Sequence, residues 1–263
     1  MPRRKSHPAV RVTLCLLLCA GILGVFWKAH GLLGLPRPFS FSIQRNPASQ
    51  DTSRDSRELT VSAHTIYALQ LGAFAQQEAA AQTAREYAAR GAAGYIMNDA
   101  GTYRVLAAAY PSRAEAQAVQ TRLNGQGIST YIHPGTQEAF ALRVGGTASQ
   151  VRALQETLAY LDALGGKLHT LSNTLDAGEA ELADTQAALS SECVTCRQFS
   201  QRLADAFGGT LPEALTSLGD TLLSIADCLP REASAARTGA ALKHAELTVF
   251  YGLCAFRQAA EGA

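Results

Sequence analysis

The sequence is poor in aromatic side chains and nearly neutral in net charge. Only 7% of its 263 residues are Phe, Trp or Tyr, and the formal net charge is +1. Because Ala is abundant while aromatic residues are scarce, the composition favours helix over a large all-β fold. So small a net charge provides no general attraction to nucleic acid or to anionic lipid. The length allows one or two domains with a core.

The cysteines fit neither a dense disulfide scaffold nor a paired zinc pattern. Two of the six lie in the first apolar run, and the others are Cys193, Cys196, Cys228 and Cys254. The Cys193-Val-Thr-Cys196 pair falls in a helical stripe where both thiols would fill core, no second pair follows, and His169 and His244 stand alone. We therefore expect no metal and no cofactor. A disulfide among the four cysteines stays open, in any of three connectivities.

No catalytic arrangement is visible. The sequence has no nucleophile elbow, no zinc-ligand spacing and no convincing carboxylate pair. The acidic residues that could be considered as catalytic are expected on a solvated helix face: Glu179, Glu181, Asp184 and Glu192. We predict a protein that is not an enzyme.

The N-terminal segment predicts a membrane anchor. Residues 1–11 are basic without any acidic residue, and Val12–Trp27 is apolar apart from Thr13. Leucines up to position 35 extend the span if Lys28 reaches back to the interface, where Trp27 also belongs. Because a basic flank stays inside, residues 1–11 are predicted to be a cytoplasmic tail and residues 12–35 a single-pass signal anchor. The rest would lie outside the bacterial cell membrane.

The sequence disfavours three alternatives to this anchor. A cleaved signal peptide needs small residues at its cleavage site, and Leu18-Cys19-Ala20-Gly21 offers few. A lipoprotein signal at Cys19 is disfavoured by the bulky Leu before it. A buried helix of a soluble domain is disfavoured by the basic flank. Residues 36–63 follow with three prolines, many polar residues and no helix or strand period, which predicts a flexible linker.

The stretch from Tyr67 to Ile132 contains the same pattern twice, at an offset of 36 residues. Tyr67-Ala-Leu-Gln-Leu-Gly-Ala-Phe74 opens the first copy, and Tyr103-Arg-Val-Leu-Ala-Ala-Ala-Tyr110 opens the second. Self-similarity at a fixed period indicates a repeated structural unit. Each copy has a short apolar run, a helical run and another short apolar run, which predicts strand, helix, strand.

The doubled unit predicts an α+β fold. We expect strands near 65–74, 94–98, 102–109 and 128–132, and helices near 77–90 and 112–124. Gly91 and Gly127 lie where a glycine ends a helix. The order βαββαβ predicts a ferredoxin-like, RNP-like domain, with a four-stranded antiparallel sheet and both helices on one face.

The other face of this sheet is expected to be open. By alternation it carries Ala68, Gln70, Gly72, Thr102, Arg104 and Leu106. Tyr95 and Tyr131 join them if Ile96 and Ile132 point into the core, whereas Tyr103 falls on the core side.

These residues resemble the SPOR (sporulation-related repeat) family over about residues 64–135. The resemblance is carried by Tyr67-x-Leu-Gln70-Leu-Gly72-Ala-Phe74, the Ala-rich helix ending in Gly91, Tyr103-Arg104-Val105, Ser112-Arg-Ala-Glu115-Ala116 and Leu123-x-x-x-Gly127. It implies binding of peptidoglycan, preferentially of septal glycan strands from which amidases have removed the stem peptides, with the sugar chain across the open face. Family sequences usually read Gly-Pro-Phe where Ala108-Ala109-Tyr110 stands, so we expect an altered groove edge.

The residues expected to contact the glycan are Gln70, Gly72, Ala73, Tyr95, Thr102, Tyr103, Arg104 and Tyr131. An amide such as Gln70 can donate and accept at once, which suits N-acetyl groups and hydroxyls. The planar fork of Arg104 matches a muramic acid carboxylate. Tyrosine rings offer flat apolar surface for a sugar ring.

The residue pattern of the C-terminal half predicts helices after one short strand. A short strand is expected at Glu138–Val144, on the sheet edge. Apolar residues then recur at spacings of three and four from Val151 to Leu175, with a break or kink at Gly165-Gly166. Further stripes run through 182–207, from Leu211 and from about residue 232. Residues 146–263 should therefore form a helical bundle or long hairpins, following a SPOR domain at 64–145.

The predicted function is non-catalytic peptidoglycan binding by a membrane-anchored protein at the division or sporulation septum. In the alternative, the protein is an envelope adaptor whose C-terminal helices bind an envelope or division protein, and the sheet domain only localises it. RNA binding shares the βαββαβ order, but the aromatic RNP1 pattern is absent from the third strand and the anchor places the domain outside the cell. A cell-wall hydrolase would need a catalytic helical half.

Overall fold

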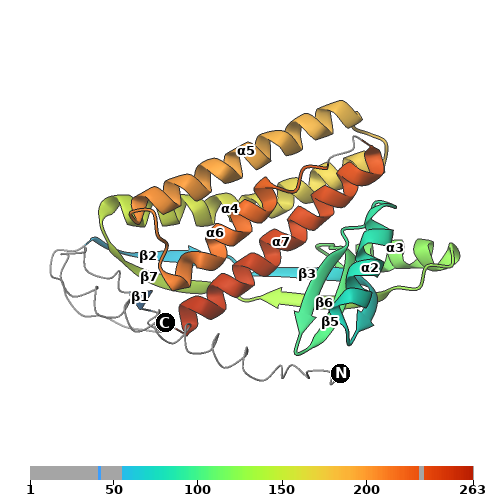
Figure 1. Ribbon diagram of the computed structural model, residues 1–263, viewed down its shortest axis with the longest axis horizontal. Coiled ribbons are helices and arrows are strands. Elements are labelled where there is room, and N and C mark those ends of the chain that lie inside the picture. Colours follow the sequence, from blue (N-terminus) through green and yellow to red (C-terminus); the bar gives the residue numbers. More distant parts are fainter. Residues whose placement is uncertain (1–40, 43–54, 231–233, 263) are drawn as a thin grey trace, which may run out of the picture. The chain divides into compact units, whose positions relative to one another are not determined.

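The computed structural model describes residues 41–42, 55–230 and 234–262 of the chain. Figure 1 shows the mixed βα part beside a group of helices. The strands are β1 (Phe41–Ser42), β2 (Asp55–Val61), β3 (His64–Phe74), β4 (Tyr95–Asp99), β5 (Thr102–Ala108), β6 (Tyr131–Gln137) and β7 (Phe140–Gly146). The helices are α2 (Gln77–Ala88), α3 (Arg113–Gly125), α4 (Ala148–Asp176), α5 (Leu182–Ala206), α6 (Glu213–Ala226) and α7 (Ala235–Glu261).

The doubled stretch forms the predicted four-stranded antiparallel sheet. Its strand order is β4-β5-β3-β6, and every neighbouring pair is antiparallel. Helices α2 and α3 lie on one side of it (Figure 1). Gly91 and Gly127 follow these helices with φ of 98° and 78°. This left-handed backbone is readily adopted by glycine, so the predicted helix ends are confirmed.

Aliphatic strand residues pack against small helix residues on the side of α2 and α3. Val105 packs with the alanines of α2, while Leu69 and Ile132 pack with Ala116 of α3. Alanine on the facing helices lets them lie close to the sheet. Burying each large aliphatic side chain contributes about 1.5–3 kcal/mol. Ile96 also packs on this side, so the predicted orientation of both outer strands is confirmed.

Strands β2 and β7 continue the ladder of β3 and β6 beyond the sheet. Val61 pairs with Phe140, and three residues further along each strand His64 pairs with Gln137. Because the register carries over unchanged, residues 55–70 and 131–146 form one long two-stranded ribbon. β1 pairs with the other edge of β7, which gives a second sheet of order β1-β7-β2.

Two predictions for these segments are wrong. Part of the expected linker 36–63 is strand β2, and the strand expected at 138–144 lies in the second sheet instead of on the edge of the first. In β2 only Leu59 and Val61 face the helical core, with Glu58 and Thr60 exposed between and beside them. So short an alternation of buried and exposed residues is hard to recognise in the sequence. The segment forms a strand because it pairs with β7.

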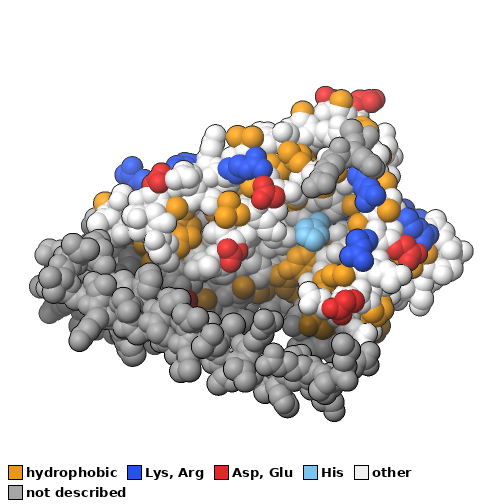
Figure 2. Space-filling view, viewed as in Figure 1, with side chains coloured by type: hydrophobic (Ala, Val, Ile, Leu, Met, Phe, Trp, Pro, Cys, Tyr) orange, Lys and Arg blue, Asp and Glu red, His pale blue; other side chains and the backbone are white. Residues whose placement is uncertain are grey.

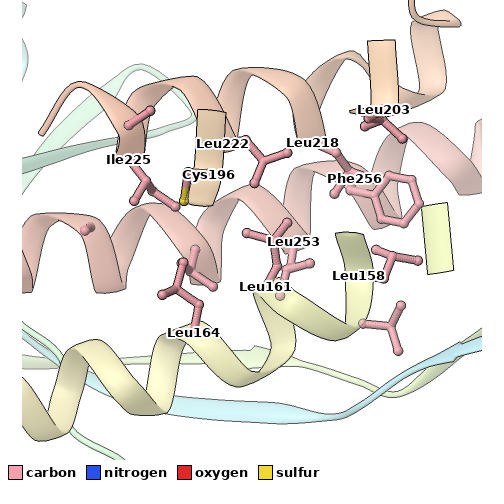
Figure 3. Packing of buried hydrophobic residues seen from close by; sticks show 14 of the residues in the cluster. Leu158, Leu161, Leu164, Cys196, Leu203, Leu218, Leu222, Ile225, Leu253 and Phe256 are labelled. Carbon is pink, nitrogen blue, oxygen red and sulfur yellow. The ribbon is translucent and has the colours of Figure 1, made fainter. Parts of the chain in front are cut away.

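Helices α4 to α7 form the predicted bundle. Figure 3 shows Leu161 and Leu164 of α4 meeting Leu222 of α6 and Leu253 of α7 in one core. The expected break at Gly165-Gly166 is wrong, because α4 runs continuously for 29 residues. A Cβ added at Gly165 would lie 3.7 Å from Val249 of α7. A Cβ would therefore make an ordinary van der Waals contact there, and α4 packs beside α7 at this glycine.

The predicted membrane anchor at residues 12–35 lies outside the described residues. Within the residues that the structure does describe, no helix is both long and apolar enough to span a bilayer. The anchor therefore stays a prediction from the sequence.

The ribbon can be tested by comparing two neighbouring residues of β2. Leu59→Ala should lower the free energy of unfolding by about 2–4 kcal/mol, because Leu59 is 6% exposed and packs in the helical core. Thr60→Ala, on the exposed side of the same strand, should change it by less than about 0.5 kcal/mol. Urea unfolding of the full chain measures both. Equal effects would show that β2 does not pack on the bundle.

Candidate functional site

The sheet face turned away from α2 and α3 carries most of the predicted contact residues. Directly paired residues of an antiparallel ladder share a face. The pairs on this face are Gln70 with Tyr131, Tyr95 with Leu106, Met97 with Arg104 and Asp99 with Thr102. The predicted grouping of Gln70, Tyr95 and Arg104 on one face is confirmed.

Helix α7 covers part of this face. Leu247 of α7 is 0% exposed and packs among Ala68, Leu106 and other residues of the sheet. A Cβ added at Gly135 of β6 would lie only 3.0 Å from the ring of Phe250. The small residues Ala68 and Gly135 therefore give the helix its close approach. The prediction of a wholly open face is wrong, because the helical half of the same chain occupies part of it.

The tyrosine expected to receive a sugar ring is covered by a tyrosine of α7. The rings of Tyr95 and Tyr251 stack with centroids 5.3 Å apart and planes 15° apart. His244 contacts the same Tyr95 ring, with centroids 5.3 Å apart, and its Nδ1 lies 3.1 Å from the carbonyl oxygen of Ala93. Burial raises the pKa of Tyr95 to about 12. The ring of Tyr95 is therefore part of the contact with α7 and is not free to stack on a sugar ring.

Arg104 lies at the centre of a polar network beyond the edge of α7. Its Nε and Nη2 donate to Asp99 Oδ2 at 3.0 and 2.9 Å, and its Nη1 donates to Gln70 Oε1 at 3.1 Å. The Arg104 side chain is 26% exposed. Asp99 already occupies the fork that was predicted for a sugar carboxylate. The Gln70 amide nitrogen is held beside this network and can donate to a ligand.

Other residues of this accessible part surround the network. Tyr131 is 65% exposed, and it is the most exposed large hydrophobic residue of the described chain. Ala73 pairs with Arg104 and is exposed, and Thr102 is half-buried. Burial, and then the nearby Arg104 charge, lowers the pKa of His133. We call Gln70, Ala73, Asp99, Thr102, Arg104, Tyr131 and His133 the outer half-face.

Two predicted contact residues lie on the opposite side of the sheet. A bulge in β3 shifts the register between Leu69 and Gly72, so Gly72 pairs with Val105 on the side of α2 and α3. Tyr103 also packs on that side, as strict alternation indicated. The expected exposure of Gly72 on the open face is wrong, because the extra residue of the bulge reverses the alternation. The same reversal brings Ala73 onto the outer half-face.

The segment Ala108-Ala109-Tyr110, expected to reshape a groove edge, packs against the bundle instead. Ala109 is 2% exposed and shares the cluster of Leu247. The ring edge of Tyr110 meets the ring of His169 in α4, with centroids 6.2 Å apart and planes at 90°. This segment is therefore part of the contact between sheet and helices.

Two histidine–carboxylate pairs border a cavity of about 270 Å³ between β3, α4 and α7. His64 Nε2 lies 2.6 Å from Asp162 Oδ1, and His169 Nδ1 lies 3.0 Å from Glu246 Oε1. The prediction that His169 stands alone is wrong, because α7 brings Glu246 to it from 77 residues away. The remaining walls are mostly apolar, with Phe250 among them.

The suspected catalytic and redox residues of α5 have structural surroundings. Glu192 is 5% exposed and accepts a hydrogen bond from Tyr160 at 3.0 Å, with Lys167 as its ion-pair partner. Its expected place on a solvated face is wrong. All four C-terminal cysteines are free thiols, with Cys193 Sγ and Cys228 Sγ 3.8 Å apart. Over the described ranges, no three His, Cys, Asp or Glu side chains gather as metal ligands.

Comparison with known proteins gives one family. The model of the SPOR domain family matches residues 63–134, and a second match covers residues 101–166. Neither the curated proteins nor the solved structures include a significant match to the chain. Residues 63–134 hold β3 to β6, the doubled unit, and the resemblance seen in the sequence is thereby supported.

The second match extends beyond the doubled unit, over a segment that begins like the other two copies and that we call the third copy. It begins at the second copy and runs through β7 into α4. Phe140-Ala-Leu-Arg-Val-Gly-Gly stands 73 residues after Tyr67-Ala-Leu-Gln-Leu-Gly-Ala, and a helix follows each. The third copy has a strand and a helix but no second strand, since α5 follows α4 among these elements.

The His169–Glu246 pair predicts a pH dependence of stability. The hydrogen bond with Glu246 raises the pKa of His169, and burial raises the pKa of Glu246. The raised pKa of His169 means that the folded chain favours its imidazolium, so this stabilisation is fully present below the unfolded pKa of His169 and is lost as the pH rises through its folded pKa. His169→Gln should therefore destabilise the chain more near pH 6.5 than near pH 9.

Urea unfolding of both chains at the two pH values measures this difference. His133→Gln is the control, because the pKa of His133 is lowered and its effect should have the opposite sign. A destabilisation by His169→Gln that is equal at both pH values would contradict the assignment.

Proposed function

We propose that the protein binds peptidoglycan without catalysis, and that the outer half-face is the part that contacts the glycan. The observation that carries this proposal is the match of residues 63–134 to the SPOR domain family, a family of peptidoglycan-binding domains. The exposed polar network of Gln70 and Arg104 beside Tyr131 supports the location. The anchor predicted at residues 12–35 would tether the protein to the membrane, at the division or sporulation septum.

The chemistry of the outer half-face suits a glycan strand freed of its peptides. Such a strand presents hydroxyls, N-acetyl groups and lactyl carboxylates. Gln70 Oε1 already accepts from Arg104, so its amide nitrogen remains as a donor to an N-acetyl oxygen. The exposed Tyr131 ring offers a flat apolar surface to a sugar ring. A carboxylate would have to share Arg104 with Asp99, which favours neutral contacts over charged ones.

Because α7 covers Tyr95, the surface that we propose for the glycan is shorter than the whole sheet face. Sugar rings cannot reach the region of Ala68, Leu106 and Tyr95 while Leu247 and Tyr251 fill it. We therefore expect the strand to lie over β3, β5 and β6 at the end marked by Tyr131 and Arg104. A binding site of this size recognises only a few sugar units.

The adaptor role is kept as a second candidate because of exposed apolar side chains on the bundle. Val194 of α5 and Leu223 of α6 are 49% and 48% exposed, and Leu229 after α6 is 39% exposed. Exposed apolar side chains can mark a protein contact where they form a contiguous patch, whereas singly scattered ones need no explanation. A partner bound there would leave the outer half-face free.

Pelleting with cell-wall sacculi tests the proposed glycan site. The full chain should pellet with amidase-treated sacculi more than with untreated sacculi. The double change Gln70→Ala and Arg104→Gln should weaken this binding by about tenfold, since hydrogen bonds involving a charged group contribute about 1.5–3 kcal/mol. Tyr131→Ala should weaken it similarly, and circular dichroism should stay unchanged in each variant.

Arg85→Gln is the matched control, because Arg85 is an exposed residue of α2 on the opposite side of the sheet. Tyr95→Phe should also keep full binding, since its ring is covered. No pelleting with either preparation would refute glycan binding. Full binding by the Gln70 and Arg104 variant would place the site elsewhere.

A further inference from the structure

A second pocket lies on the other side of the sheet, away from the outer half-face. It has a volume of about 450 Å³ and is bounded by α2, α3, the end of α4 and the start of α7. Its volume is within the range of small-molecule sites, about 300–1,000 Å³. Nothing in the proposed glycan contact uses this pocket.

Part of the pocket lining is apolar. We call these apolar lining residues the floor of the pocket: Leu71, Ala107, Val119, Leu123, Ile128 and Leu175. Leu71, Val119 and Ile128 remain only half-buried, although they lie on the core side of the sheet or next to it. A core that is left partly open in this way favours an apolar group as its occupant.

Basic side chains line the pocket. Lys243 of α7 is neutralised by Asp176 at 2.8 Å and donates to the Gly91 carbonyl oxygen at 3.0 Å. Arg90 and Arg122 have no carboxylate partner within 4.0 Å among the described residues, and Arg90 instead lies over the Tyr87 ring at 5.2 Å. Among the described residues, the pocket is therefore lined by two guanidiniums without a carboxylate partner, and its one carboxylate, Asp176, is already paired with Lys243.

The start of α7 adds to the positive potential. Ala235 and Ala236, the first residues of α7, line the pocket, and the first turn of α7 contains no acidic residue. A helix N-terminus carries a partial positive charge. Figure 2 shows Lys and Arg side chains on the surface where α2 and the start of α7 lie.

We propose that this pocket binds a single-chain anionic amphiphile, with its apolar chain on the Leu71–Val119–Ile128 floor and its head group between Arg90 and Arg122. The two guanidiniums favour an anionic head group because the charges are complementary. The half-buried apolar floor favours an apolar chain. A cationic amphiphile would meet two unpaired guanidiniums. An anion without a chain would leave the floor uncovered.

Calorimetric titration of the full chain with decanoate, kept below its micelle concentration, tests this site. Saturable binding of decanoate is expected, and decyl phosphate distinguishes a phosphate head from a carboxylate head. Acetate lacks the apolar chain, and decyltrimethylammonium lacks the negative charge. Each should therefore bind at least about tenfold more weakly than decanoate, which corresponds to a loss of about 1.4 kcal/mol or more in binding free energy. Equal binding of decyltrimethylammonium would overturn the proposal.

Variants locate the site. Arg90→Gln with Arg122→Gln should weaken decanoate binding by at least about tenfold, and Val119→Trp should do the same by filling the floor. Arg85→Gln changes an exposed residue of α2 that does not line the pocket, and it should stay within about twofold of the parent chain. The Arg90 and Arg122 variant should still pellet with treated sacculi, so this site and the glycan site fail independently.

Unchanged decanoate binding in the folded Arg90 and Arg122 variant would overturn the proposal. Absence of saturable binding for both anionic amphiphiles would do the same. Circular dichroism and the urea midpoint verify that each variant is folded. If Val119→Trp does not fold, the double arginine variant alone decides the outcome.

Discussion

Helix α7 is buried on two sides, and the arrangement of the whole chain depends on this double contact. One side, with Leu242 and Leu253, belongs to the core of the bundle, while Leu247 packs into the sheet. Burying a leucine fully contributes about 1.5–3 kcal/mol, and here the same helix makes such contacts in both directions. Moving α7 off the sheet would therefore require moving the bundle with it. The covered part of the sheet is a structural interface, and the outer half-face lies beyond it.

The repeated pattern leads directly from the sheet into the bundle. The third copy starts as the first two do, with a strand and then a helix, but its strand β7 extends β6 and pairs with β2. Its helix α4 then begins the bundle and places His169 beside Glu246 of α7. A half-copy cannot close a second four-stranded sheet, since no strand follows α4 among the described elements. Its apolar residues are buried by further helices instead.

The sequence was sufficient to predict the helices and strands that local residue patterns determine. The 36-residue repeat, the glycines at 91 and 127 and the helical stripes were sufficient for the sheet, its two helices and the bundle. Three features of the structure were not predicted from the sequence, because they depend on partners that are distant in the sequence. Strand β2 has only two inward apolar residues and is selected by β7, while the bulge near Gly72 reverses an alternation that looks regular. The covering of Tyr95 by Tyr251 joins residues 156 positions apart.

The segment Ala108-Ala109-Tyr110 can now be interpreted in terms of this interface. It was expected to change the groove edge, and through it the preference for a glycan. Ala109 instead contacts the cluster around Leu247, and Tyr110 meets His169, which holds Glu246 of α7. The two residues thus connect the sheet to α7 and α4, at a distance from the network of Gln70 and Arg104 along the strands. Ala109 and Tyr110 therefore belong to the interface with the bundle, and neither contacts the hydrogen-bonded pair of Gln70 and Arg104.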